Sequence, residues 1–293
     1  LPIQEETGLS FNADSVKVAV DGKAVDAASY TVKTTGLTDG CTFEVVFADL
    51  KTAVTAAKAS SVITVDYTST LTEQAVRGNQ GNVNKAKLQF SNNPNSEQGG
   101  ESTPTGETPW DNVIVFTYKL DTTKVDSKNA DTKLQGAEFK LKNSEGKYAV
   151  VNDGKVTSWN DEGTTLTSDA QGLFSVTGLD AGTYYLHETK APAGYNLPAS
   201  DFKVEITAAT VNGQNWSGTA DEALTALQVT VDGGTAIKGD IRNGNVAINI
   251  VNTQGSSLPS TGGMGTVMLY VAGVAVLVLA GATLVMALRR RNA

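Results

Sequence analysis

Cysteine and histidine are nearly absent from this chain of 293 residues, which contains one of each, Cys41 and His187. A single cysteine cannot form a disulfide within the chain, so the sequence excludes a disulfide framework. The usual zinc sites need several cysteine or histidine ligands and are excluded as well. The acidic stretch at 126–133 lacks the loop glycine and the closing glutamate of a calcium-binding EF-hand. The sequence therefore predicts no metal site and no cofactor.

Basic residues are outnumbered, since 23 lysines and arginines stand against 31 aspartates and glutamates, a net charge of −8. Binding to nucleic-acid phosphates requires a basic face, so we expect no nucleic-acid partner. Motifs for nucleophilic catalysis are missing too. His187 stands beside Glu188, but strand alternation turns its side chain outward, and no second histidine exists to activate Cys41. We therefore expect that the protein is not an enzyme.

Long apolar runs are missing, with one exception at residues 266–288, where 23 residues carry no charge. About 20 apolar residues are enough to span a bilayer as a helix, so we expect a transmembrane helix there. Three arginines follow in the tail at 289–293, and such residues stay on the cytoplasmic side. Residues 1 to about 257 are then outside the cell. The chain begins without a basic, apolar leader, and we expect that it is a fragment of a longer exported protein.

The rest of the chain has the composition of strands and turns, with many threonines, valines, glycines and asparagines. Short alternating segments occur in two sets, at 1–96 and 112–256, separated by a predicted linker loop at 97–111 that is rich in proline, glycine, serine and threonine. This pattern predicts an all-β fold of two tandem Ig-like β-sandwich domains before the C-terminal helix. In the first set, strands are expected at 15–20, 29–34, 42–50, 60–71 and 84–92.

Three strands of the second set each end an apolar face with one polar residue. Successive side chains of a strand point to opposite faces, so every second residue shares a face. The three faces are Phe116, Tyr118, Leu120, Thr122 and Lys124; Tyr184, Leu186 and Glu188; and Val246, Ile248, Ile250 and Asn252. Burying any one of the three polar ends alone would be costly. An amine, a carboxyl and a carboxamide that meet in one buried place can instead react with one another.

We expect that reaction to join Lys124 to Asn252. A desolvated lysine is driven toward its neutral form, which is a nucleophile. Glu188 can hydrogen-bond the Asn252 carboxamide and carry the proton that turns the departing nitrogen into ammonia. The product is an amide between Lys124 Nζ and Asn252 Cγ, formed once per molecule because the fold supplies the proximity.

The same region resembles a known family. The segment "TKVDSKNADTKLQGAEFKLKNSEGKY" resembles the opening of CNA-B-type (SpaA prealbumin-like) domains, and "GLDAGTYYLHETKAPAGYN" is similar to their E-box signature. The resemblance implies an isopeptide domain at 112–256, with Lys124 and Asn252 as the joined residues and Glu188 as the catalytic one. Lys119 is the rival lysine in the same strand, but its side chain alternates to the opposite face.

The sequence "LPSTGG" follows this domain and resembles the LPxTG sorting signal of Gram-positive surface proteins. Its order, with the signal at 258–262 before an apolar span and a basic tail, is more specific than the pentapeptide alone. The resemblance implies that a sortase cleaves between Thr261 and Gly262 and passes the Thr261 carboxyl to an amine. That amine belongs either to another subunit or to the wall peptide. The signal consists of Leu258, Pro259, Ser260, Thr261 and Gly262.

The first set of strands resembles the penultimate (D2-type) domain of major backbone pilins, through "GLSFN" and "VDYTSTLTEQAVRGNQGNVNKAKLQFSNNPN". Such domains often hold their own Lys–Asn bond. The resemblance implies an acceptor in "SNNPN", with Asn92 as the first candidate and the donor lysine upstream of Leu1.

Together these resemblances imply a Gram-positive, LPxTG-anchored backbone pilin that is secreted and held in the cell wall. Its expected partners are a class C-type pilus sortase, a housekeeping sortase, other pilin subunits and peptidoglycan. The alternative is a wall-anchored adhesin or minor pilin that binds host ligands. A pilin-motif lysine in a preceding segment would favour the first reading, and a large extra binding domain there would favour the second.

Overall fold

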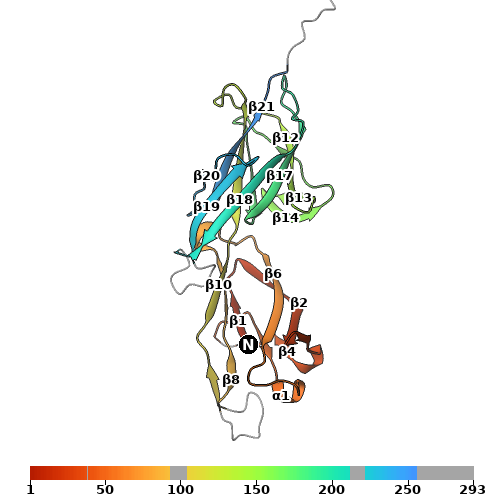
Figure 1. Cartoon of the computed structure of the whole chain (residues 1–293), viewed down its shortest axis with the longest axis vertical. Coiled ribbons are helices and arrows are strands. Elements are labelled where there is room, and N and C mark those ends of the chain that lie inside the picture. Colours follow the sequence, from red (N-terminus) through yellow and green to blue (C-terminus); the bar gives the residue numbers. More distant parts are fainter. Residues whose placement is uncertain (38, 93–103, 212–221, 256–293) are drawn as a thin grey trace, which may run out of the picture.

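The computed structural model describes residues 1–37, 39–92, 104–211 and 222–255. Strands make up almost all of its regular structure, in two units that follow one another along the long axis of the molecule (Figure 1). The prediction of an all-β fold is confirmed. The helical elements with bounds inside the described residues are short: the single turn α1 (Leu50–Ala53) and the 3-10 turns η1 (Ala27–Ser29) and η2 (Gly78–Gln80). No helix in the described parts of the chain is long and apolar enough to cross a membrane, and the span predicted at 266–288 lies outside them.

The first unit is built from two facing sheets and one ribbon. One sheet has the order β10-β7-β1-β5-β4 and the other β3-β2-β6. Their core contains Ile3, Val18, Phe43 and Val45, and Phe11 of β2 stacks on Phe43 of β5 with ring centroids 3.6 Å apart. The strands are β1 (Pro2–Glu5), β2 (Leu9–Val20), β3 (Lys23–Ala24), β4 (Thr31–Lys33), β5 (Phe43–Val46), β6 (Ile63–Leu71), β7 (Asn82–Ala86) and β10 (Asp111–Val115); β8 (Gln89–Ser91) and β9 (Thr105–Glu107) form the ribbon.

The segment predicted as a linker differs from that expectation. Within 97–111, residues Thr105–Glu107 form β9, which pairs with β8. Strand β10, assigned from the sequence to the second unit, pairs instead with β7 of the first unit, with Val113 opposite Asn84. The apolar alternation of 112–126 continues without a break through both units, so the sequence pattern could not reveal where the chain changes sheets.

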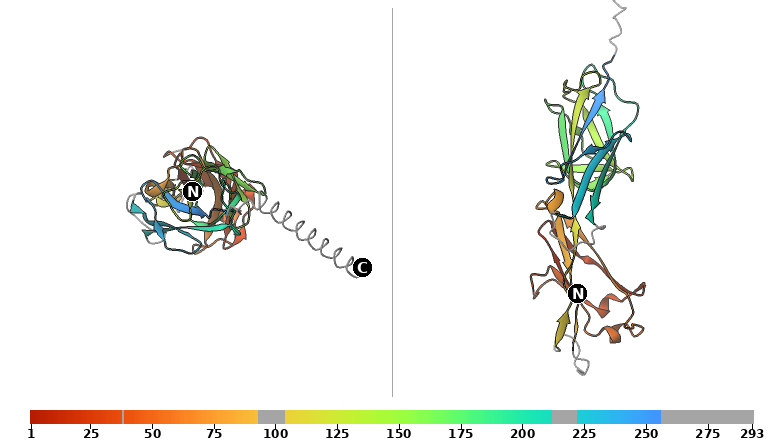
Figure 2. Two further views of the ribbon diagram at one scale, coloured as in Figure 1. Left: turned by 90° about the horizontal axis from the view of Figure 1, so that it is seen from above. Right: turned by 60° about the vertical axis from the view of Figure 1, so that its left-hand side comes forward.

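The second unit is one hydrogen-bonded sheet of 11 strands that curls over on itself. Its order is β20-β19-β18-β17-β12-β13-β14-β16-β11-β21, with β15 paired to β12. The curl brings β19 and β20 beside β21 (Figure 2). The buried side chains of the two halves of the sheet form one core. The strands are β11 (Tyr118–Asp126), β12 (Glu138–Asn143), β13 (Tyr148–Asn152), β14 (Lys155–Asn160), β15 (Leu166–Thr167), β16 (Leu173–Leu179), β17 (Gly182–Lys190), β18 (Phe202–Thr210), β19 (Leu224–Val231), β20 (Ile237–Lys238) and β21 (Asn245–Asn252).

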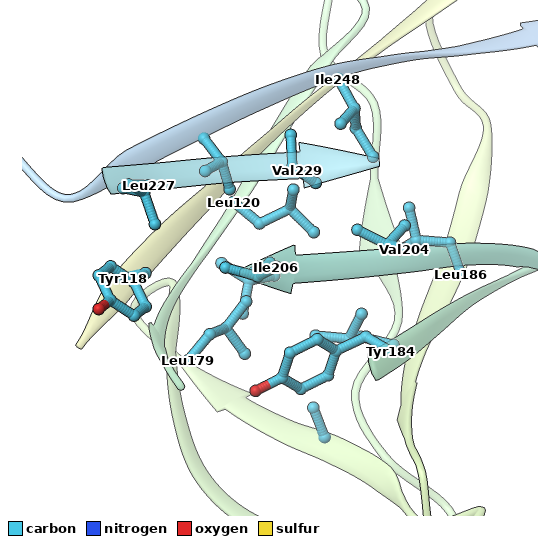
Figure 3. Packing of buried hydrophobic residues seen from close by; sticks show 14 of the residues in the cluster. Tyr118, Leu120, Leu179, Tyr184, Leu186, Val204, Ile206, Leu227, Val229 and Ile248 are labelled. Atoms are coloured by element: carbon cyan, nitrogen blue, oxygen red, sulfur yellow. The ribbon is translucent and has the colours of Figure 1, made fainter. Parts of the chain in front are cut away.

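The core of this unit comes from alternate residues of its strands. Figure 3 shows Leu120 of β11, Leu186 of β17, Ile206 of β18 and Ile248 of β21 pointing into one cluster. Each of these side chains is buried. Because side chains alternate between the two faces of a strand, the residue two positions after a buried apolar one also points inward. This alternation directs the polar residues near the ends of the strands into the core.

Hydrogen bonds of the backbone and of side chains join the two units. The Asn79 N–H donates to Ile241 O at 2.9 Å, and the Arg77 guanidinium donates to Asn245 Oδ1 at 3.2 Å. Two glycines make this approach possible, since a Cβ on Gly244 would lie 2.4 Å from Gly78 N and one on Gly78 would lie 2.3 Å from Arg242 O. Both have positive φ, which only glycine adopts readily.

Candidate functional site

Three polar side chains lie buried together at one end of the second unit's core. Lys124 of β11 is 0% exposed, Glu188 of β17 is 4% exposed and Asn252 of β21 is 3% exposed. Glu188 and Asn252 are the last inward-facing residues of their strands and follow apolar ones, whereas Lys124 stands between the buried Thr122 and the buried Asp126 on the inward face of β11. The structure therefore brings together the three residues named from the sequence.

The three side chains form a closed triangle of hydrogen bonds. Lys124 Nζ donates to Glu188 Oε2 at 3.0 Å and to Asn252 Oδ1 at 2.5 Å. Asn252 Nδ2 donates to the other carboxylate oxygen, Glu188 Oε1, at 2.6 Å. One carboxylate thus contacts both the amine and the carboxamide nitrogen.

The strand pairing sets this geometry. Strands β11 and β21 run parallel, with Lys124 opposite Ile250 and Asp126 opposite Asn252, so the amine and the carboxamide are diagonal neighbours. Strand β17 reaches the same place through β12, where Glu188 lies opposite Phe139. The backbone of Lys124 is fixed on its other side, because its N–H donates to Gly172 O at 2.7 Å. The residues come from segments 64 and 128 positions apart in the chain.

Apolar side chains surround the amine. Lys124 Nζ lies 5.4 Å from the ring centroid of Phe139 and 5.5 Å from that of Phe202. Burial lowers the pKa of the Lys124 amine, although the neighbouring Glu188 carboxylate opposes that shift. A larger fraction of the amine is therefore neutral, and so nucleophilic, than on a solvated lysine.

A second layer of contacts holds the end of β21. Tyr195 OH donates to Asp126 Oδ2 at 3.0 Å, and the Ser127 N–H donates to Asn252 O at 3.0 Å. Beyond the strand, Asn196 N–H donates to Thr253 O at 3.0 Å. Asp126 and Tyr195 both lie within the quoted motifs, but strand alternation does not pair a loop tyrosine with an aspartate, so the sequence pattern gave neither residue a role.

The other residues considered as functional candidates lie away from the triangle. Lys119 is on the outer face and pairs with Asp121 at 2.7 Å, well away from the triangle in the strand register. His187 is half-exposed, and its Nδ1 lies 2.7 Å from Asp201 Oδ1. Cys41 is a partly buried free thiol, and burial raises its pKa, which makes it less reactive. Within the described ranges, no group of three histidine, cysteine or acidic residues is placed to hold a metal ion.

The remaining predicted residues divide into two groups. Asn92 is exposed at the end of β8, where its N–H donates to Pro104 O at 2.8 Å. The sorting signal, from Leu258 to Gly262, lies outside the described residues. The structure therefore gives no geometry for the sortase reaction.

The triangle has the parts required for amide exchange. The amine lies within hydrogen-bond distance of the carboxamide it would attack, and one carboxylate contacts both nitrogen atoms. That carboxylate can take a proton from the attacking nitrogen and give one to the leaving nitrogen. The site is dry and fixed by strands, so little reorganisation is needed before reaction.

Comparisons with known proteins identify two segments of the chain. Residues 118–218 match the SpaA family, described as a prealbumin-like fold domain. Residues 250–293 match the LPXTG cell wall anchor motif. The first match contains Lys124 and Glu188, and the second begins two residues before Asn252.

Whole-chain relatives agree with these segments. The trypsin-resistant surface T6 protein of Streptococcus pyogenes serotype M6 is 27% identical over 345 residues, a match that covers 98% of this chain and 59% of the relative. The chain thus spans about three fifths of that relative's length. The crystal structure of the pilus 2b backbone protein of group B streptococcus has 25% identity and a TM-score of 0.50, covering 88% of this chain and 86% of that one. A 35 kDa C-terminal fragment of the major pilin GBS80 of Streptococcus agalactiae shares the fold, with 20% identity, 85% of each chain covered and a TM-score of 0.53.

Proposed function

This chain belongs with the LPXTG-anchored backbone pilins that carry a SpaA prealbumin-like domain, and from that premise we propose that it is a structural subunit of a sortase-assembled pilus. Its anchor motif makes it a cell-surface protein attached to the wall. The second unit would be a self-crosslinking domain running from about residue 117 to the sorting signal, with the first unit ending at β10.

The central proposal is an intramolecular amide between Lys124 and Asn252. The observation that carries it is the buried triangle, in which Lys124 Nζ lies 2.5 Å from Asn252 Oδ1 and Glu188 contacts both partners. Neutral Lys124 Nζ attacks Asn252 Cγ, the Nζ–Cγ bond forms, and the Cγ–Nδ2 bond breaks. Glu188 moves one proton from Nζ to Nδ2, which leaves as ammonia. The reaction happens once in each molecule, so the protein modifies itself and turns over no substrate.

The second proposal concerns the chain's outer connection. Cleavage between Thr261 and Gly262 by a pilus sortase or a housekeeping sortase would free the Thr261 carboxyl for transfer to an amine. That amine would belong to a lysine of the next subunit or to peptidoglycan. The anchor motif supports this proposal. The relative's name describes resistance to trypsin, and a covalently closed second unit would give this chain the same property.

Intact mass spectrometry of the chain ending at Thr261 tests the central proposal. We expect a mass lower than the sequence mass by one ammonia, about 17 Da, because the amide forms without an added enzyme. The variant Lys124→Arg keeps a cation at the site but lacks the nucleophile, so its full sequence mass should return. Lys119→Arg is the matched control on the same strand, and it should keep the loss. A full mass for the unchanged protein would contradict the proposal.

A further inference from the structure

Strand β21 ends at the extremity of the second unit that lies away from the first unit (Figure 1). Beyond β21, residues 253–255 pair with residues 194–196 of the loop after β17 in a short antiparallel contact, which we call the terminal pair. Asn196 N–H donates to Thr253 O at 3.0 Å, and Gly255 N–H donates to Gly194 O at 2.9 Å. The terminal pair therefore fixes the chain up to Gly255, where the described residues of this unit end.

The terminal pair limits the distance between the second unit and the sorting signal. Leu258, the first residue of the signal, stands three positions after Gly255 in the sequence. A chain covers at most about 3.3–3.6 Å per residue, so Leu258 lies within about 11 Å of Gly255 whatever conformation joins them. Without the terminal pair, the last fixed residue would be Asn252, and the reach of Leu258 would about double.

An enzyme that holds the signal in a groove must therefore touch the end of the second unit. Even a small domain is about 30 Å across, nearly three times the reach of Leu258. Two segments surround the place where the chain leaves the unit, the loop at 191–200 and the turn at 127–133. Their backbone N–H groups donate to Thr253 O and Asn252 O. The contact surface of the enzyme must lie on one or both of these segments.

The two segments differ in charge. Residues 191–200 contain no charged side chain, whereas the exposed turn at 127–133 contains two lysines and an aspartate. Within the uncharged loop, Ala193, Leu197 and Ala199 are exposed, Leu197 at 53%. Leu197 also directly follows Asn196, which binds the outgoing chain. Exposed apolar side chains without charged neighbours are typical of the centre of a protein–protein interface, and charged side chains are typical of its rim.

We propose that the loop at 191–200, with Leu197 at its centre, is a docking surface for the pilus sortase. The terminal pair keeps the signal so close that the enzyme buries Leu197 while its groove holds residues 258–262. The partner surface that fits is an apolar one beside the groove. This docking presupposes the cleavage between Thr261 and Gly262 proposed above. It adds recognition outside the pentapeptide, which lets an enzyme that joins copies of one protein select this chain.

Cleavage kinetics of the full chain of 293 residues, dissolved in detergent, test the docking surface. The probe is the recombinant pilus sortase of the bacterium that produces the chain, with hydroxylamine as the amine. The Thr261–Gly262 bond breaks, the hydroxylamine nitrogen binds the Thr261 carbonyl carbon, and mass spectrometry measures both products. Leu197→Ser should raise KM roughly tenfold and leave kcat unchanged, a loss of about 1.4 kcal/mol of binding. The matched control is Leu88→Ser, because Leu88 is 48% exposed but lies in the first unit, and its KM should not change.

A spacer separates docking from recognition of the signal. Eight residues of alternating glycine and serine inserted after Gly255 extend the reach of Leu258 to about 36–40 Å, so the enzyme no longer has to touch the loop. In this chain KM should be raised, and the effect of Leu197→Ser should shrink to less than about threefold, because the effective concentration of the loop falls with linker length.

Three results would overturn the docking surface: an unchanged KM for Leu197→Ser in the chain of natural length, an equal effect of this variant with the spacer, or sedimentation showing that Leu197 instead holds two copies of the chain together. A synthetic peptide of residues 256–265 distinguishes these results from a failure of the proposed function. If the sortase cleaves neither this peptide nor any of the chains, the proposed cleavage itself is wrong, and the docking surface with it.

Discussion

The Lys124 amine is fully buried, and it contacts both a carboxylate and a carboxamide. The dry site favours the neutral amine, and the carboxylate holds the geometry. Glu188 is the residue on which this balance depends, because it contacts both reacting groups. A substitution of Glu188 that keeps the size of the side chain tests its role in proton transfer while leaving the packing of the site unchanged.

Glu188→Gln should leave the fold intact but prevent bond formation, since glutamine keeps the size of the side chain and cannot relay a proton. The mass should equal that of the sequence. A crosslink between residues 128 positions apart restricts the unfolded chain strongly. By analogy with disulfides, its absence should cost about 5 kcal/mol and lower the unfolding temperature by about 10–20 °C. Calorimetry checks this value, and an unchanged melting temperature in a variant of full mass would count against the crosslink.

The uncrosslinked variant should also gain a pH dependence. In Glu188→Gln, burial keeps the pKa of Lys124 below its unfolded value, so the unfolded chain binds more protons than the folded one between the two values. The free energy of unfolding should therefore rise with pH in that interval, up to the unfolded pKa of lysine. Urea unfolding at several pH values measures the slope. The double variant Lys124→Met, Glu188→Gln should lack it, and an equal slope in both would show that Lys124 is not its source.

The residues of the site could be named from the sequence because strand alternation and the family motifs both fix them. Lys124, Glu188 and Asn252 each continue, at a spacing of two residues, the inward face of a strand that begins with apolar side chains. Asp126 and Tyr195 gave no such signal, because Tyr195 lies in a loop whose sequence has no strand period. Their contact depends on how the chain folds around the site, and local sequence does not carry that information.

At the scale of elements, the ends of β11 and β21 are held by the loop after β17. Tyr195 contacts Asp126. Backbone hydrogen bonds from Asn196 N–H to Thr253 O and from Gly255 N–H to Gly194 O join the loop to the residues that follow β21. Asp126 also caps the turn after β11 by accepting from the Lys128 and Asn129 N–H groups, and the backbone bond from Lys128 is the main cause of its lowered pKa. The loop therefore orders the segment that leads to the sorting signal.

Tyr195→Phe should weaken this order. The change removes one hydrogen bond to a carboxylate, for which we expect a loss of about 1–2 kcal/mol in the free energy of unfolding. Hydrogen exchange of the Asn196 and Gly255 amides should become faster. Tyr185→Phe, in β17 and without a hydrogen bond to Asp126, serves as the control. Unchanged exchange at both amides would show that Tyr195 does not hold this segment.

Element boundaries were the least predictable part of the fold. The three inward-facing patterns of the second unit were clear, but β10 was assigned to the wrong unit because its valines and isoleucine continue the pattern of β11. A strand that leaves one sheet and enters another without a turn residue between them gives no sequence signal. Only the pairing of β10 with β7 shows where the chain crosses.

At the scale of the whole molecule, the junction of the two units depends on Gly78 and Gly244. Gly244→Ala should separate them, because the added Cβ would lie 2.4 Å from Gly78 N. Gly233→Ala is the matched control, since Gly233 also has positive φ but no atom within 4 Å of the added Cβ. We expect small-angle scattering to report a broader range of inter-unit angles for Gly244→Ala only. Identical curves for the two variants would show that the close approach does not fix the junction.

The parallel arrangement of β11 and β21 has a mechanical consequence. The chain enters the second unit at Tyr118 and leaves it after Asn252, and the proposed amide joins the far ends of those two strands. In the proposed fibre, a pulling force along the chain would run along β11, cross at Lys124 to Asn252 and leave the unit, while the strands between them would carry no load. In single-molecule pulling, this unit should therefore show no extension step before the polypeptide itself breaks.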